Sequence, residues 1–318
     1  MWISPYKYVL SLGHLCSDIN QSILSAVLPF LIATYHYDYT TAAMLVTVSN
    51  VFGAFVQPFI GMLSDKKNKL LYMTLGVLLA SGGMAVTGFI SNFFGLCIAV
   101  IISGIGVAMF HPQAAKLINS VSSKNAKGKG MSIFSFGGKV GFTLGPVYTA
   151  FLMNLFGMKG TILFLIPGIV FGIVCSFFNK DFENLDVLEV EKKEEVKSEQ
   201  KDDWSGFIKL CGVVFSRSIL SNGISTFLAF YFIQQFSKSN SFASMLLSVF
   251  YGIGSITLLG GGIADCFGHR KMVRLSFCIF LPAIFIFTNT SHFVIALIML
   301  IFMTCGESLS YSPMVVLG

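Results

Sequence analysis

The chain has 318 residues, of which 54% are hydrophobic and only 11% are charged, and its mean hydropathy is +0.77. Soluble domains carry about 25% charged residues, so this composition excludes a soluble globular enzyme. Apolar runs near 20 residues can cross roughly 30 Å of hydrocarbon, and the sequence contains about ten of them. The sequence therefore predicts an all-α protein that crosses a membrane many times.

Breaks in the apolar pattern divide the chain into six predicted spans, a charged segment and four further spans. The predicted spans are residues 8–33, 42–62, 70–90, 93–117, 131–155, 160–178, 206–236, 242–262, 273–290 and 292–314. Seven cysteines are scattered without a C-x-x-C pair, which argues against a disulfide framework or a zinc site. The first run is too long for the core of a signal peptide, and we expect it to stay as the first helix.

The positions of the basic residues predict the orientation of the chain in the membrane. With a cytoplasmic N-terminus, twelve lysines and arginines lie near the inner ends of the spans, whereas only Lys159 and Lys238 lie outside. Since positive charge concentrates on the cytoplasmic side, we expect the N-terminus and the central segment to be cytoplasmic in the plasma membrane. The net charge of +6 then reflects orientation and gives no reason to expect a nucleic-acid partner.

The central segment, residues 179–205, holds ten of the 15 acidic residues. It has too little apolar surface to offset the entropy of ordering, so we expect a solvated linker. The predicted domains are an N-terminal six-helix bundle (1–178), this charged linker (179–205) and a C-terminal bundle (206–318).

A repeat relates the two halves. The loop 61–69 reads GMLSDKKNK and the segment 261–271 reads GGIADCFGHRK, with their aspartates 200 residues apart. A carboxylate at a helix end can cap the next helix and pair with nearby cations, so these loops are expected to act as gates. The gating residues predicted from the two loops are Gly61, Asp65, Lys66, Lys69, Gly261, Asp265, Arg270 and Lys271. Charge that merely sets topology is the alternative.

The paired G-x-x-x-D-x-x-x-[KRH] loops resemble the signature loop of the major facilitator superfamily, and parallel halves fit that arrangement. Further segments are similar to the fosmidomycin resistance protein family of proton-coupled efflux transporters. These are 13–21 (GHLCSDINQ), 106–115 (GVAMFHPQAA), 137–146 (GGKVGFTLGP) and 216–218 (SRS) followed by Gly223. That family has an acid where Gln113 stands and an amide where Lys139 stands.

The resemblance implies a monomeric secondary transporter that exports a small anionic or amphiphilic compound in exchange for protons, without a cofactor or metal. The segment Gly141-x-x-x-Gly145-Pro146 resembles the antiporter motif of the superfamily, in which glycines allow close helix approach and proline bends the helix. By the same likeness, two last spans would lie beyond Gly318, and the chain is expected to be a fragment or a degraded product.

Asp18 lies roughly 15 Å into the first span, near the expected midplane, and His14 lies one turn below on the same face. Charged groups at this depth are costly and therefore face a cavity or a partner. We expect Asp18 to take up and release the coupling proton, with His14 tuning it. A permanent helix-packing pair is the alternative.

Other polar residues in the spans are candidates for a substrate cavity. Lys139 and Arg217 could hold an anionic group of the substrate or neutralise acids, and Glu307 could pair with Arg217. His111, beside Pro112, could lie on a proton or substrate path or simply fill a kink. The predicted cavity residues are Asn20, Gln21, His111, Gln113, Lys139, Arg217 and Glu307.

Three other functions compete. A symporter that imports a sugar or organic acid shares the fold, although the G-x-x-x-G-P element argues against it. An intramembrane enzyme with a metal on His14, Asp18 and His111 has too few ligands with metal spacing. A non-functional remnant would lack part of its cavity wall.

Overall fold

The computed structural model describes residues 6–63, 69–121, 127–192, 204–256 and 267–309, and these residues form helices and short connections without a strand. The chain divides into two compact units, Met1–Val196 and Lys197–Gly318. The boundary falls inside the range 179–205 that the sequence assigns to a linker. The division into a six-helix and a four-helix bundle remains a prediction.

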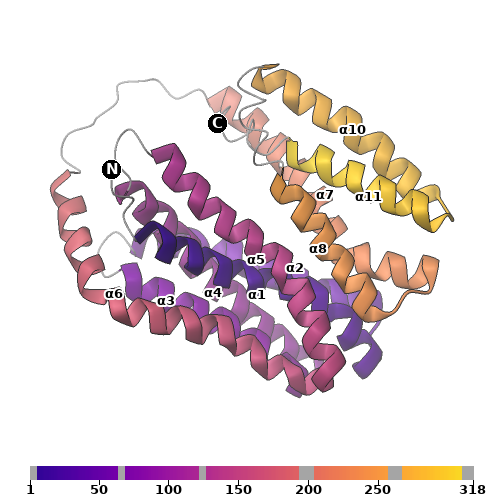
Figure 1. Ribbon diagram of the computed structural model, residues 1–318, viewed down its shortest axis with the longest axis horizontal. Coiled ribbons are helices and arrows are strands. Elements are labelled where there is room, and N and C mark those ends of the chain that lie inside the picture. Colours follow the sequence, from indigo (N-terminus) through magenta and orange to yellow (C-terminus); the bar gives the residue numbers. More distant parts are fainter. Residues whose placement is uncertain (1–5, 64–68, 122–126, 193–203, 257–266, 310–318) are drawn as a thin grey trace. The chain divides into compact units, whose positions relative to one another are not determined.

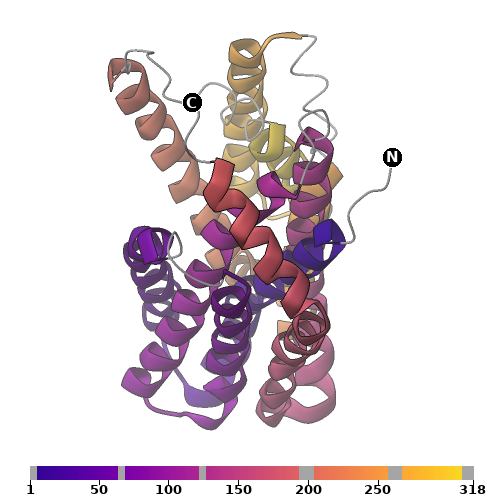
Figure 2. The same ribbon diagram turned by 90° about the vertical axis from the view of Figure 1, so that its left-hand side faces the viewer.

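Unit 1 contains six long helices, packed side by side as a bundle (Figures 1 and 2). They are α1 (Tyr6–Tyr35), α2 (Tyr39–Leu63), α3 (Lys69–Ala85), α4 (Phe93–Ser120), α5 (Lys127–Phe156) and α6 (Leu165–Lys192). Two short 3₁₀ helices, η1 (Val86–Phe89) and η3 (Gly157–Phe164), follow α3 and α5. Each long helix overlaps one of the first six predicted spans. The last part of the span 70–90 is η1 and the first part of the span 160–178 is η3.

Unit 2 contains four long helices in its described part. They are α7 (Trp204–Phe236), α8 (Asn240–Ile256), α10 (His269–Asn289) and α11 (Phe293–Leu309). Helix α11 packs against α7, α8 and α10, so it has neighbours on several sides. The all-α membrane fold expected from the apolar runs is confirmed.

The expectation for the charged segment is wrong at its start. Helix α6 continues to Lys192, well into the range predicted to be a solvated linker. The reason is local, because residues 169–192 contain one glycine and no proline, and Glu, Leu and Lys favour a helix. A segment that lacks apolar surface can therefore still extend a helix that the membrane span has already nucleated.

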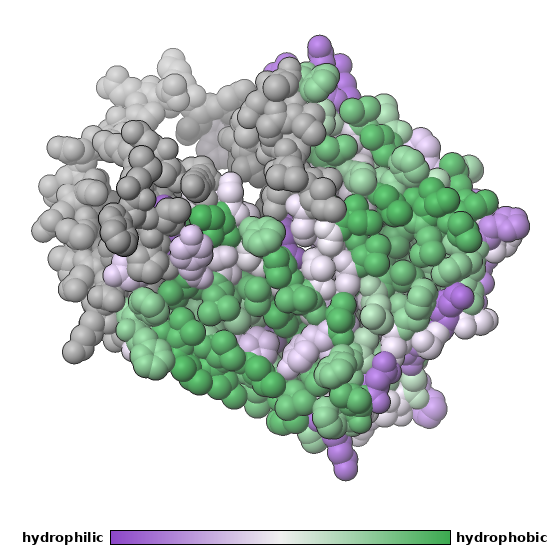
Figure 3. All heavy atoms as spheres, in the orientation of Figure 1, coloured by the Kyte–Doolittle hydropathy of each residue, from purple (hydrophilic) through white to green (hydrophobic). Residues whose placement is uncertain are grey.

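Seven helical stretches among the described residues are long and apolar enough to cross a membrane. One of them, Gly130–Phe178, includes most of α5 and the first part of α6. Large apolar side chains lie on the outside, including Phe94, Phe177 and Met62, which are 80%, 79% and 71% exposed. Hydrophobic residues cover most of the described surface in Figure 3. Such a surface is suited to lipid, where helices satisfy their own backbone hydrogen bonds.

Helix α1 is the central element of unit 1. It contacts α3, α4, α5 and α6. In its most apolar stretch of 18 residues, 72% of the residues are buried. Gly13 makes this packing possible, because a β-carbon there would lie 2.6 Å from the Phe171 ring and 2.7 Å from the Phe110 ring. Asp18 and Asn20 of α1 are consequently enclosed by protein, at 3% and 0% exposure.

The turn between α1 and α2 is closed by a cap. The Asp38 carboxylate accepts a hydrogen bond of 2.6 Å from the backbone N–H of Thr41, which satisfies a free donor at the start of α2. Hydrogen bonds from the side chain and then the backbone of Thr41 lower the pKa of the Asp38 carboxyl. Asp38 is exposed, so its role is confined to the end of the helix.

Candidate functional site

Three ionisable side chains meet inside unit 1. His14 Nε2 lies 3.2 Å from Asp18 Oδ2, and His111 Nε2, which comes from α4, lies 3.3 Å from Asp18 Oδ1. The Asp18 side chain is only 4% exposed, whereas those of His14 and His111 are 14% and 27% exposed. The structure thus brings both predicted proton-coupling residues together with one predicted cavity residue. We call these three residues the Asp18 cluster.

The orientation of the His14 ring limits where a proton can be. Nδ1 lies 2.9 Å from the backbone carbonyl oxygen of Phe134, and the ring stacks on the Phe134 ring with 4.1 Å between centroids. A carbonyl oxygen can only accept, so Nδ1 carries a hydrogen. In a neutral ring, Nε2 would then be an acceptor that faces a carboxylate. A proton shared between His14 Nε2 and the Asp18 carboxylate removes this electrostatic repulsion. The geometry therefore suits a cluster that holds one proton.

Gly138 of α5 makes room for this pair. A β-carbon on Gly138 would lie 2.5 Å from His14 Nε2 and 2.6 Å from Asp18 Oδ2, closer than real β-carbons come to other atoms. Any side chain at this position would push His14 and Asp18 apart. Gly138 is therefore part of the site, although the sequence did not single it out.

Lys139 adds a positive charge on the α5 side of the cluster. Its side chain is half-buried, and it directly follows Gly138, which lies against His14 and Asp18. His14, His111 and Lys139 are the charged or titratable groups that α1, α4 and α5 contribute around Asp18 in the described part of unit 1. The carboxylate is accordingly surrounded by groups that are, or can become, positive.

The other predicted cavity residues of unit 1 lie away from this cluster. Asn20 is fully buried and donates to Ser81 Oγ of α3 at 2.9 Å and to the Cys16 carbonyl at 2.8 Å. Gln113 is fully buried and donates to the Ile60 carbonyl of α2 at 3.4 Å. Gln21 is exposed. Asn20 and Gln113 thus join helices α1, α3, α4 and α2.

The glycines of the predicted antiporter motif face α1. A β-carbon on Gly141 would lie 2.4 Å from the Leu15 carbonyl oxygen, and one on Gly145 would lie 2.0 Å from Ser22 Oγ. Pro146 follows inside α5 and is buried. The motif therefore brings α5 against the helix that carries Asp18, as expected for small residues in a membrane helix pair.

The Asp18 cluster also has the composition of a metal site. Its two imidazole nitrogens and one carboxylate oxygen lie within 4.8 Å of one another. A proton between His14 and Asp18 already accounts for the arrangement, and a tetrahedral site needs a fourth ligand. The expectation that no metal is bound remains a prediction.

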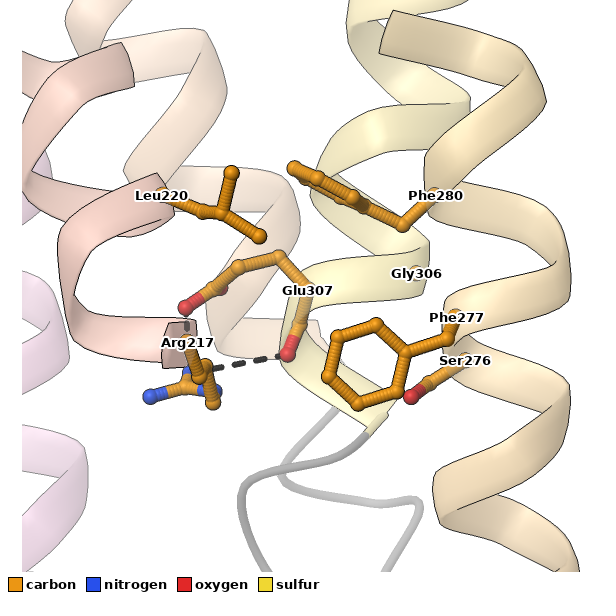
Figure 4. Close-up of a pocket in the computed structure, with 7 residues that line it drawn as sticks. All are labelled: Arg217, Leu220, Ser276, Phe277, Phe280, Gly306 and Glu307. Carbon is orange, nitrogen blue, oxygen red and sulfur yellow. Dashed lines mark hydrogen bonds and ion pairs between the residues drawn. The ribbon is translucent and has the colours of Figure 1, made fainter. Parts of the chain in front are cut away.

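Unit 2 contains a second charged site. Arg217 Nη2 of α7 forms an ion pair with Glu307 Oε1 of α11, as expected from the sequence, and also approaches the Glu307 carbonyl at 3.5 Å. The side chains are 16% and 12% exposed. The pair lies in a pocket of α7, α10 and α11, shown in Figure 4. The pocket is lined by Arg217, Leu220, Ser276, Phe277, Phe280, Gly306 and Glu307.

Most of the predicted gating residues cannot be placed. Asp65, Lys66, Gly261 and Asp265 lie outside the described residues, as does the side chain of Lys69. Arg270 and Lys271 are exposed in the first turn of α10. The Gly61 carbonyl, near the end of α2, accepts a hydrogen bond of 3.3 Å from Lys116 of α4. The proposed gating by these loops stays a prediction.

Comparison with known proteins identifies the family, because residues 10–318 match the pattern of the Major Facilitator Superfamily. The chain belongs to the Major Facilitator Superfamily. It is therefore a membrane transporter and not an enzyme.

Individual relatives are distant. The chain is 23% identical over 269 residues to the fosmidomycin resistance protein of Escherichia coli (strain K12), which covers 83% of this chain and 66% of that protein. It is 24% identical over 278 residues to the uncharacterised MFS-type transporter YfnC of Bacillus subtilis (strain 168), covering 85% and 68%. The chain thus spans about two thirds of the length of these relatives.

A solved structure shows the same fold. A bacterial homologue of the human lysosomal transporter Spinster, crystallised in an inward-facing and occupied conformation, superimposes with a TM-score of 0.80 at 18% identity. The match covers 98% of this chain and 73% of that one. At this identity the likeness establishes the transporter fold alone.

The sequence analysis did not assign Gly138, Phe134, Phe277 or Phe280 to a site. Gly137 extends the four-residue spacing of the predicted motif glycines Gly141 and Gly145, which indicates one close-packed helix face, and Gly138 adjoins that face. Phe277 and Phe280 are three residues apart on α10 and share a face in the same way. The Phe134 carbonyl has no sequence signal, because every residue has one.

Proposed function

We propose that this member of the Major Facilitator Superfamily is a proton-coupled antiporter that exports a small anionic or amphiphilic compound by alternating access. The Asp18 cluster would hold the coupling proton. Arg217, Glu307 and Lys139 would contribute to recognition of the substrate. The cell membrane is the proposed location and the monomer the proposed form.

One observation carries this proposal: the His14 ring donates from Nδ1 to a backbone carbonyl while its Nε2 faces a buried carboxylate at 3.2 Å. This arrangement supports one proton shared between His14 and Asp18. When that proton leaves, an acceptor and an anion face each other in a poorly hydrated site, which costs free energy. The cluster must then rearrange or become hydrated.

Such a rearrangement can drive transport. A ligand shifts a conformational equilibrium only by its different affinity for the two states. In an antiporter, proton and substrate must therefore favour opposite states. His111, at 3.3 Å from the other oxygen of Asp18, offers a second partner for the carboxylate in the proton-free state. The cluster has the elements of a two-state proton site.

The experiment uses fosmidomycin, the compound in the name of the E. coli relative, in proteoliposomes with an imposed pH gradient. An antiporter accumulates the compound when the lumen is acidic, because protons leave as it enters. A symporter accumulates it when the outside is acidic, so the direction separates the two mechanisms. We expect accumulation with an acidic lumen and its loss in Asp18→Asn.

Asp38→Asn is the matched control, because it removes an exposed carboxyl group from the turn beside the same helix. It should transport like the unaltered protein, and both variants should elute as folded protein. A pH-dependent infrared signal from a carboxyl group should be lost in Asp18→Asn alone. Undiminished gradient-driven transport by Asp18→Asn would contradict the proposal, as would a stoichiometric metal ion in the purified protein.

A further inference from the structure

The ligand atoms of the Asp18 cluster have the spacing of a metal site. His14 Nε2, His111 Nε2 and one Asp18 carboxylate oxygen lie within 4.8 Å of one another. Neighbouring ligands of a tetrahedral zinc ion, each about 2.0–2.1 Å from the metal, are about 3.3 Å apart. The distances from His14 Nε2 and His111 Nε2 to the Asp18 oxygens, 3.2 Å and 3.3 Å, match this separation.

We propose that the Asp18 cluster binds a divalent transition metal ion of the zinc type when the ion is supplied from solution, and that the bound ion inhibits transport. The ion is a regulator and not a resident cofactor, so the chain purified without added metal holds the proton instead. The inhibition rests on the proposed function, because the ion occupies the groups that hold the coupling proton there. Binding itself needs no proton gradient.

The orientation of His14 prepares its second nitrogen for a metal. Nδ1 donates to the Phe134 carbonyl oxygen at 2.9 Å, so Nε2 of the neutral ring carries a lone pair. Histidines that bind metals almost always donate their other ring N–H to a carbonyl or carboxylate in this way, which fixes the ring. A cation between Nε2 and the Asp18 carboxylate replaces the repulsion between a lone pair and an anion with two attractive contacts.

Asp18 retains an oxygen that a metal can satisfy. Its Oδ1 is buried and accepts no hydrogen bond of good geometry from the described residues, although His111 Nε2 lies 3.3 Å away. The side chain is only 4% exposed, so solvent does not compensate this oxygen. A buried polar atom without a partner costs free energy, and coordination of a metal ion removes that cost.

Gly138 and His111 leave space and a route for the ion. A β-carbon on Gly138 would lie 2.5 Å from His14 Nε2 and 2.6 Å from Asp18 Oδ2, so the glycine keeps free a position close to both ligand atoms. The His111 side chain is 27% exposed, more than the other two, and its side of the cluster is open to an ion and to water. Two histidines and one carboxylate, with water as the fourth ligand, form a set found in catalytic zinc sites.

The donor atoms determine which kind of ion binds. Imidazole nitrogens suit zinc, copper, nickel and iron, whereas calcium and magnesium prefer oxygen ligands. The positive charge of Lys139, next to Gly138 on α5, opposes any cation at this position. Coordination by the two imidazoles, and not charge attraction alone, therefore holds the ion.

The binding test titrates Zn²⁺ into the purified full chain in detergent, after a chelator has been applied and removed. We expect one ion per chain by calorimetry, and we expect Co²⁺ in its place to show the visible absorption of a tetrahedral site. Loss of an outer-shell partner lowers metal affinity about 10–100-fold, so loss of a ligand should lower it at least about 100-fold. The variants His14→Gln, Asp18→Asn and His111→Gln should each show this loss.

Two control variants make the binding result specific. His292→Gln removes an exposed histidine that precedes α11 in unit 2, and it should bind Zn²⁺ like the unaltered protein. Lys139→Gln removes a positive charge beside the cluster and should bind at least as tightly. Each variant should elute as folded protein. Absent Zn²⁺ binding by the unaltered chain, or binding that survives the loss of each ligand in turn, would overturn the inference.

Transport in proteoliposomes tests the inhibition. Zn²⁺ should slow gradient-driven transport, a chelator should restore it, and Mg²⁺ at the same concentration should have no effect. The transport that remains in His111→Gln should be at least about tenfold less sensitive to Zn²⁺, because a ligand is missing. Equal sensitivity of His111→Gln and the unaltered protein would contradict inhibition at this site.

The outcome is separable from that of the proposed function. Transport that depends on Asp18, together with absent Zn²⁺ binding, would reject the metal site alone. Zn²⁺ binding that depends on the three ligands, together with transport that ignores Asp18, would reject the proton site alone.

Discussion

The two units hold charge in different ways. In unit 1 a carboxylate lies between two imidazoles, and in unit 2 a carboxylate pairs with a guanidinium. Imidazole changes charge near neutral pH, whereas guanidinium stays positive. The Asp18 cluster therefore contains groups whose charge can change, whereas the charge of Arg217 is fixed. In the proposed function, this difference places the coupling proton in unit 1 and a substrate contact in unit 2.

Both sites depend on a glycine that lets two helices approach. Gly138 gives the His14–Asp18 pair its space, and Gly306 of α11 lies so close to α10 that a β-carbon would be 2.9 Å from Phe280 N and Ser276 O. In the first case the glycine faces the charged groups themselves. In the second case the glycine faces the backbone of α10 at Ser276 and Phe280.

The largest loss of proton-driven transport is expected from Gly138→Ala. The added methyl group collides with both members of the His14–Asp18 pair, so proton-driven transport should fall below a tenth of the unaltered rate. Overpacking of this kind costs typically about 1–3 kcal/mol of stability. The rate is measured in proteoliposomes and the stability by thermal unfolding.

Gly82→Ala of α3 is the control for this change, because no atom lies within 4 Å of a β-carbon added there. It should keep full transport and gain up to about 1 kcal/mol from helix propensity. Equal transport by Gly138→Ala and Gly82→Ala would mean that the geometry of the Asp18 cluster is unimportant.

The second largest effect is a difference in transport rate between variants of the two histidines. His14 is held by Phe134 and Asp18, whereas the described contacts of His111 include Asp18 and a T-shaped contact with the His14 ring at 5.2 Å. His14→Gln should therefore lower transport more than His111→Gln. Hydrogen bonds to charged groups contribute about 1.5–3 kcal/mol, so a difference of roughly tenfold is expected.

The pH dependence of transport distinguishes this role from simple packing. The His14→Gln variant should shift the pH profile, since it removes the partner that shares the proton with Asp18. His111→Gln should shift it less. Profiles that keep their shape in both variants, with only a lower maximum, would indicate that the histidines merely pack.

The smallest effect is expected from Gly306→Ala. It should push α11 away from α10 and lower the free energy of unfolding by about 1–3 kcal/mol, measured by thermal unfolding. Gly223→Ala of α7 is the matched control in the same unit, because a β-carbon there meets no atom within 4 Å. A larger loss of stability in Gly223→Ala than in Gly306→Ala would show that the close approach of α10 and α11 at Gly306 is unimportant.

Sequence and structure agree best on the helices. Every predicted span contains a described helix, because an apolar run of about 20 residues in a membrane has essentially one way to satisfy its backbone. The prediction failed at α6, which continues to Lys192, since the end of an apolar run marks where lipid ends and not where helix ends. The helix propensity of the residues beyond the apolar run decides where the helix ends.

The sequence by itself determined that this is a multi-pass helical protein of the Major Facilitator type, with His14 and Asp18 on one face of the first helix. Hydropathy, spacing of four residues and loop motifs are local properties, so they can be read along the chain. Only the tertiary structure decided that His111 joins Asp18, that Gly138 makes room for it, and that Arg217 meets Glu307 beside two Phe rings. These contacts join residues from about 60 to 120 positions apart. Helix packing, which no local pattern encodes, sets such distances.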